Sequence, residues 1–168
     1  MLRAAGIVAL FVFTACGQNN GVSLASPSPV IAQGNWTQNL SFTGELTGQM
    51  TAIVADTADQ ANACTGSKTR NGEQWADTFY GMIDASGRVW EIGFLVNNFR
   101  GPGTYHSADM SLVVRSLDHN KVWLNLPRDK VTFTLDAGQQ SGTVNAALTD
   151  GNTGKPGLKV TGHWNCRG

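Results

Sequence analysis

From Trp36 onward, apolar and polar residues alternate with a period of two, and this pattern limits the fold more than any other feature of the sequence. In the segment 131–135, for example, Val131, Phe133 and Leu135 alternate with two threonines. Alternation of this kind, with Gly, Asn and Asp between the segments, is typical of short antiparallel strands that bury one face. The pattern therefore predicts an all-β domain over residues 36–168.

The alternating segments predict about nine strands and no long helix. The clearest segments are 49–55, 78–84, 88–96, 110–117, 121–126, 131–136, 143–149 and 158–166, together with Leu40 and Phe42. Only the Ala-rich stretch 55–63 favours a helical turn or two, and it has no apolar stripe to bury. The even spacing of strands and turns predicts an antiparallel β-sandwich, with a closed lipocalin-like β-barrel as the alternative.

The first residues form a separate unit. An apolar run of ten residues, 4–13, follows the positive charge of Arg3. A membrane-spanning helix needs about 20 residues, whereas the apolar region of a secretory signal has about 7–15. The run is therefore typical of an export signal.

Small residues, Thr14 and Ala15, then lead directly to Cys16. This arrangement resembles the lipobox of bacterial lipoproteins, with Phe13 where leucine is commonest. The resemblance implies a signal peptide at 1–15, cleaved before Cys16, and a diacylglycerol on the Cys16 thiol. Two acyl chains hold a protein stably on a membrane. An ordinary secretory signal, cleaved after a nearby small residue, is the alternative.

Residues 16–35 are predicted to be a tether. Beyond Cys16 they are small, polar and uncharged, with two Ser-Pro pairs. Such a composition does not bury enough apolar surface to fold. As a flexible coil this stretch spans roughly 24 Å, which would lift the domain off a membrane surface.

The three cysteines divide into one and two. Once Cys16 carries lipid, Cys64 and Cys166 remain. An exported compartment is oxidising, so we expect a disulfide between them. It would close a loop of about 100 residues, worth about 4.7 kcal/mol in the chain-entropy treatment. A structural zinc needs four ligands in paired clusters, and Cys64 has no nearby Cys or His, so we expect no metal site.

Charge and composition exclude two classes of protein. The chain of 168 residues has 12 basic and 12 acidic side chains and a net charge of zero. A nucleic-acid-binding domain carries a basic surface, so we expect no nucleic-acid partner. An apolar content of 41% is too high for a disordered chain.

Catalytic motifs are absent from the sequence. The sequence has three histidines and three glutamates. The combinations His106 with Asp109 and Asp118 with His119 could be acid–base pairs, but both lie beside predicted turns. We therefore expect neither an enzyme nor a cofactor.

The most distinctive internal stretch is 100–105, where Gly-Pro-Gly lies between Arg100 and Tyr105. It predicts a sharp turn, either as a structural corner under Tyr105 or as a binding loop with Arg100 and Tyr105 at its mouth. Trp75 lies in a polar stretch, and the alternation around Trp123 leaves its ring on the face opposite Val122 and Leu124, which predicts that the ring is exposed. These two rings are the other candidates for ligand binding.

Together these features predict a lipid-anchored protein exported to a bacterial cell membrane or outer surface, with a non-catalytic binding or structural role. The pattern at 159–166 resembles the ends of small β-sandwich surface lipoproteins. An envelope protein or a glycan would be the partner. A barrel that carries a small apolar ligand and a carbohydrate-binding module are the alternatives, and a secreted enzyme is the least favoured.

Cys16→Ser removes the thiol that would carry the lipid. We expect this variant to move from the membrane fraction to the soluble fraction of lysed cells, while Ser23→Ala in the tether, the control, stays with the membranes. A Cys16→Ser protein that still sediments with membranes would show that anchoring comes from another segment.

Overall fold

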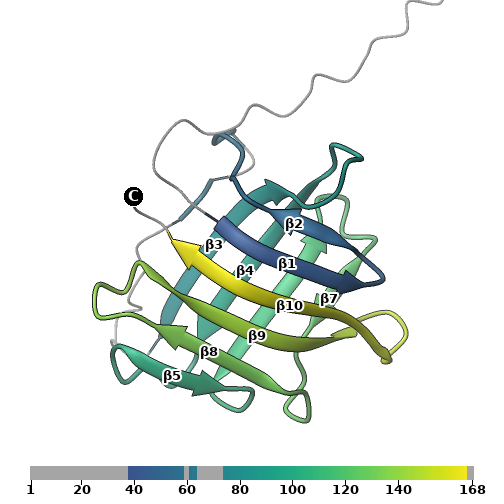
Figure 1. Ribbon diagram of the computed structural model, residues 1–168. Coiled ribbons are helices and arrows are strands. Elements are labelled where there is room, and N and C mark those ends of the chain that lie inside the picture. The colour runs from purple at the N-terminus through teal and green to yellow at the C-terminus, as the bar shows by residue number, and fades with distance from the viewer. Residues whose placement is uncertain (1–37, 59–60, 64–73, 166–168) are drawn as a thin grey trace, which may run out of the picture.

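The computed structural model describes residues 38–58, 61–63 and 74–165 (Figure 1). None of these residues is helical. They form ten strands: β1 (Gln38–Gly44), β2 (Gly48–Met50), β3 (Trp75–Met82), β4 (Val89–Val96), β5 (Gly103–His106), β6 (Met110–Ser116), β7 (Val122–Leu124), β8 (Val131–Leu135), β9 (Ser141–Asp150) and β10 (Pro156–Asn165). The segment 1–35, Cys64 and Cys166 lie outside the described residues.

All ten strands belong to one antiparallel sheet. Its neighbours run in the order β2-β1-β10-β9-β7-β6-β4-β3, and β8 and then β5 branch from β9. Figure 1 shows β1, β10, β9, β8 and β5 as a front layer that crosses steeply over the back layer of β3, β4 and β6. Near the free edges, Ile53 bridges Gly81, and the Gln49 amide donates to the Ile83 carbonyl at 2.9 Å. The sheet therefore curls into a nearly closed barrel.

Strand β9 joins the two layers. Along residues 142–146 it pairs with β8, and at Thr149 and Asp150 it pairs with β7. Its ten residues give it the length to reach both neighbours in turn. The predicted all-β class is confirmed, and the continuous sheet corresponds to the barrel alternative rather than to a sandwich of two separate sheets.

The interior of the barrel is filled with side chains. Every second residue of β3, β4 and β6 is buried. Four aromatic rings, Trp75, Phe94, Phe133 and Trp164, form a cluster in which the contacting ring centroids lie 5.0–5.8 Å apart. Such tilted and offset arrangements are favourable for aromatic pairs, each of which adds about 0.5–1.5 kcal/mol beyond its buried area. We call this set the aromatic cluster.

Several elements differ from the sequence-based expectation. The stretch 55–63 is not helical where it is described; Ala63 instead bridges Thr78 beside β3. Strand β3 begins at Trp75, earlier than expected, because the inward position after Trp75 is polar and interrupts the apolar pattern. Strand β5 has a single buried residue, Tyr105, so no apolar repeat marks its length in the sequence.

That inward polar residue is Asp77. Asp77 is 2% exposed, and its register partner in β4 is the buried Phe94. Removal of the carboxyl from water raises the pKa of Asp77 from 3.8 to about 7, although a hydrogen bond from the backbone of Thr78 lowers it in part. The neutral carboxyl is therefore favoured inside the folded barrel below neutral pH.

We expect the burial of Asp77 to make folding pH-dependent. Between pH 4 and pH 7 the folded chain holds this proton more firmly than the unfolded chain does. The stabilisation is thus fully present below pH 4 and is lost as the pH rises through 7. Asp77→Asn does not titrate. From pH 5 to pH 8 the free energy of unfolding of the wild type should therefore fall by about 2–4 kcal/mol relative to that of Asp77→Asn.

Urea denaturation of both proteins at the two pH values measures this difference. Asp109, Asp118 and Asp150 have pKa values that are lowered, so their titration lies below this window and cancels in the comparison. If the free energy of unfolding changed equally with pH in the two proteins, the prediction would be wrong.

Candidate functional site

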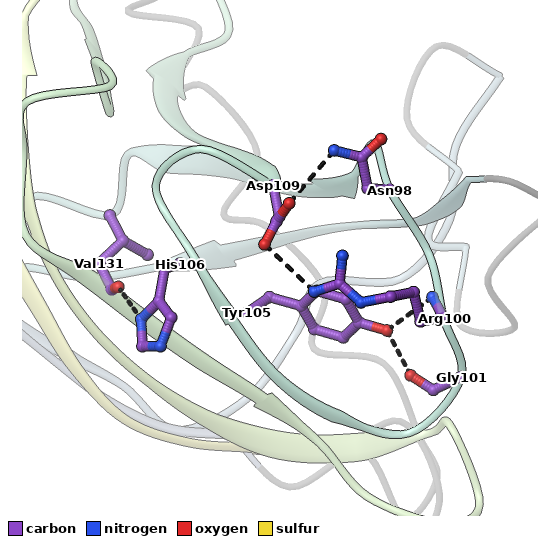
Figure 2. A network of polar contacts seen from close by, with 7 residues as sticks. All are labelled: Asn98, Arg100, Gly101, Tyr105, His106, Asp109 and Val131. Carbon is purple, nitrogen blue, oxygen red and sulfur yellow. Dashed lines mark hydrogen bonds and ion pairs between the residues drawn. The ribbon is translucent and has the colours of Figure 1, made fainter.

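The stretch 100–105 folds as a corner around Tyr105 (Figure 2). The Tyr105 residue is 2% exposed. Its hydroxyl accepts a hydrogen bond from the Arg100 amide at 3.0 Å and donates one to the carbonyl of Gly101. Gly101 has a φ of +101°, a conformation that favours glycine. Tyr105 therefore closes its own loop, and its hydroxyl is engaged by the backbone.

The charged groups of this corner bind one another. The Arg100 guanidinium lies 5.6 Å from the Tyr105 ring centroid and 3.3 Å from the Asp109 carboxylate. Asn98 donates to the other Asp109 oxygen at 3.2 Å. These hydrogen bonds, that of Asn98 first and that of Arg100 second, lower the pKa of Asp109. Figure 2 shows the side chains directed toward each other, as in a structural corner.

The tryptophan candidates lie inside the barrel. Trp75 is 0% exposed within the aromatic cluster, and Trp123 is 2% exposed and packs on Trp90 at 5.6 Å. The expected exposure of Trp123 is wrong, because β7 turns Val122 and Leu124 outward and Trp123 inward. Its indole N–H donates to the Glu45 carboxylate at 3.2 Å. The structure thus brings Arg100 and Tyr105 together but places Trp75 and Trp123 in the core.

A different group of side chains lies on the outer surface of the front layer. At the strand ends lie Ser141, Pro156, Gly157 and Asn165, and just beyond β8 the Asp136 carboxylate accepts a hydrogen bond from the Ser141 hydroxyl at 2.7 Å. The other outward side chains of β1, β10, β9, β8 and β5 bear hydroxyl, amide or basic groups, with one alanine and no carboxylate. We call them the polar face: Asn39, Ser41, Thr43, Thr104, His106, Thr132, Thr134, Thr143, Asn145, Ala147, Lys159, Thr161 and His163. Most are exposed.

Strand register aligns the polar face in rows. One row runs across the sheet through Ser41, Thr161, Asn145, Thr132 and His106, each the register partner of the next. Rows of this kind repeat about every 6.8 Å along the strands, and their members are about 4.8 Å apart. The face is therefore a regular array of groups that donate and accept hydrogen bonds.

The outer surface of the back layer is chemically different. Its residues are half-buried and mostly apolar: Ala76, Thr78, Tyr80, Met82, Val89, Glu91, Gly93, Leu95, Ser111, Val113, Arg115, Val122 and Leu124. Its two charges form an ion pair, Arg115 to Glu91 at 2.7 Å. Within the described part of the chain, positive charge without an ion-pair partner thus lies on the polar face and not here.

The polar face contains a hollow of about 450 Å³. Lys130, Thr132, Asn145, Ala147 and Lys159 line it. A second hollow, of about 430 Å³, lies beside the β3–β4 hairpin. There the side chain of Asp84 accepts hydrogen bonds from Ser86 of its own turn. The hollow on the polar face is the better candidate because its polar groups come from three separate elements.

Sequence reasoning missed this face. Each polar residue, taken alone, is the solvent-facing half of an alternating segment. The signal that could have found it is the composition of those halves: Thr, Asn, Ser, Lys and His in the segments of the front layer, against Val, Leu and Met in the back layer.

The chain matches no family model, no curated protein and no solved structure. In the described part of the chain, no three His, Cys, Asp or Glu side chains group as metal ligands would. Nor does that part contain a helix with the length and apolar character needed to cross a membrane.

Tyr105→Phe removes one hydroxyl from the corner. The Gly101 carbonyl and the Arg100 amide then lose a buried partner, so we expect a loss of about 1–2 kcal/mol in the free energy of unfolding. Urea denaturation measures it, with Thr43→Val at an exposed position of β1 as the control, expected within about 0.5 kcal/mol of wild type. Equal effects of the two substitutions would show that the corner hydroxyl is not structural.

Proposed function

We propose that the chain is a lipid-anchored protein of the bacterial cell envelope whose barrel binds a glycan, without catalysis, through the polar face. The observation that supports this most is the composition of that face. Five neighbouring strands present hydroxyl, amide and basic groups to solvent and no carboxylate.

A glycan suits such a face better than an apolar ligand does. Sugar hydroxyls both donate and accept hydrogen bonds, and Thr, Ser and Asn side chains do the same. A repeating polymer also matches a repeating array, because weak contacts add when several are made at once. The large apolar anchors typical of protein–protein contacts are missing from these outward positions.

The interior argues against the carrier alternative. The aromatic cluster occupies one part of the barrel and the Trp90–Trp123 pair another. Carriers of apolar molecules enclose a cavity for them, whereas the two hollows described above are on the outer surface.

The two candidate catalytic groups near the corner are engaged elsewhere. The His106 ring nitrogen lies 3.1 Å from the Val131 carbonyl, and the Asp109 carboxylate binds Asn98 and Arg100. This arrangement supports a binding role over an acid–base mechanism.

Anchoring belongs to the same proposal. A diacylglycerol on Cys16 would hold the chain on the membrane, and residues 17–35 would carry the barrel into the space where the glycan lies. A Cys64–Cys166 disulfide would fasten the segment after Ala63 to the end of β10. In support, Ala63 bridges β3, and Trp75 of β3 contacts Trp164 of β10 at 5.6 Å. Thiol titration of the unfolded, unreduced chain should find neither cysteine free.

Co-sedimentation with insoluble peptidoglycan tests the glycan proposal. The variant Ser41→Ala, Thr132→Val, Thr161→Val removes three hydroxyls from one row of the polar face. Each lost hydroxyl contact is worth about 1 kcal/mol, so we expect affinity to fall at least about tenfold. The control, Thr78→Val with Ser111→Ala, removes two hydroxyls from the back layer and should bind as the wild type does.

If the wild type does not sediment with the polymer, or if the row variant and the control behave alike, the proposed function is wrong. Thermal unfolding of all three proteins checks that the barrel is intact, since outward Thr→Val changes in strands preserve β propensity.

A further inference from the structure

We propose that the hollow between Lys130 and Lys159 is a subsite for an anionic substituent of the glycan, a carboxylate or a phosphate. This inference rests on the proposed function, because the hollow is part of the polar face. It adds the charge of the ligand, which the hydroxyl rows alone do not specify.

The strand pairing places the two lysines on either side of a small residue. Ala147 is the register partner of Lys159, and its amide donates to the Lys130 carbonyl at 2.9 Å. The two lysine backbones are therefore about two strand spacings apart, roughly 10 Å. Each lysine has a flexible four-carbon stem, so both ammonium groups can converge on one anion above the methyl group of Ala147.

Polar side chains complete the lining. Thr132 and Asn145 are register partners on β8 and β9 and line the same hollow. A hydroxyl and an amide group supply donors and acceptors for the neutral part of a sugar. A volume of about 450 Å³ lies within the range of sites for small ligands, about 300–1,000 Å³.

The neighbouring carboxylates are engaged away from the hollow. Asp129 accepts hydrogen bonds from the Leu126 amide at 2.8 Å and the Thr149 hydroxyl at 2.9 Å. Glu45 accepts one from Trp123.

The ion pairs among the described residues, Arg100–Asp109 and Arg115–Glu91, involve other cations. The charge of Lys130 and Lys159 is thus available to an external anion. Charge-assisted hydrogen bonds to carboxylate or phosphate are about twice as strong as neutral ones, so an anion is favoured over a neutral group here.

Two matched polymers isolate the charge of the ligand. Polygalacturonate bears a carboxylate on each sugar, and its methyl ester has the same rings without the charge. Calorimetry with the full chain should show at least about tenfold tighter binding of polygalacturonate than of the ester at low salt, with the difference reduced at high salt. Poly(glycerol phosphate) serves as the phosphate arm, and preference for it over polygalacturonate would assign the subsite to phosphate.

Three variants locate the charge on the protein. Lys130→Gln with Lys159→Gln should bring the affinity for the anionic polymer down to that for the ester. Lys121→Gln, which removes a lysine in the turn before β7, is the matched control. It should change neither the affinity for the anionic polymer nor that for the ester. Ala147→Glu places a carboxylate between the lysines and should also abolish the preference for the anion. Thermal unfolding confirms that each variant is folded.

The outcomes separate this inference from the function it rests on. If polygalacturonate and its methyl ester bind equally well, the proposed anion subsite is wrong, whereas the proposed glycan binding stands. If Lys121→Gln loses as much affinity for polygalacturonate as the Lys130→Gln, Lys159→Gln variant does, the subsite is also wrong. The attraction would then depend on the net charge of the protein alone. If neither the two anionic polymers nor the ester binds, while peptidoglycan does, the subsite is wrong and the proposed function stands. If peptidoglycan fails too, both are wrong.

Discussion

The aromatic cluster holds the two layers of the barrel together. Trp75 and Phe94 come from the back layer, and Phe133 and Trp164 from the front layer. Each ring therefore packs on partners that are far away in the sequence. Without these contacts each layer would expose an apolar face, and a sheet with one exposed apolar face is not stable by itself. The cluster is thus the place where strands β3 and β4 of the back layer meet strands β8 and β10 of the front layer.

Because side chains fill the interior of the barrel, a ligand would have to bind on its outer surface. In a barrel that carries a ligand, the inward positions form the site and the outward positions face solvent. Here the inward positions hold aromatic and aliphatic side chains, so the proposed binding would depend on what the outer surfaces present. These surfaces differ: one is hydrophilic, with lysines that form no ion pair with any residue the structure describes, and the other is mostly apolar, with Glu91 and Arg115 paired. The difference between the two surfaces, rather than a cavity, is the chemical feature on which the proposed function rests.

The inward and outward assignment of most strands could be predicted from the sequence. Alternation alone placed Val131, Phe133 and Leu135 inward, because a strand with one buried face must repeat every second residue. The same reasoning set no bounds for β5, where Tyr105 is the single buried residue, and it failed where a buried position was polar, as at Asp77. There, tertiary packing overrides the local pattern.

The candidate site could not be predicted for a different reason. The hollow combines Lys130 and Lys159 with Ala147, and their proximity depends on which strands pair and in what register. Register is set by long-range packing and by turn geometry, which a single sequence does not reveal. The Arg100–Tyr105 corner, by contrast, is local, and its turn was visible in the Gly-Pro-Gly motif.

The sharing of β9 between two neighbours has a mechanical consequence. The strand carries outward groups of the polar face, and it is also bonded to β8, β10 and β7. A displacement of the binding surface would therefore have to break main-chain hydrogen bonds in both layers. Such a surface would lose little conformational entropy on binding the proposed ligand. A rigid surface also would not adjust to a glycan whose repeat length differs from the spacing of its rows. The spacing of the strands would therefore favour glycans of one repeat length.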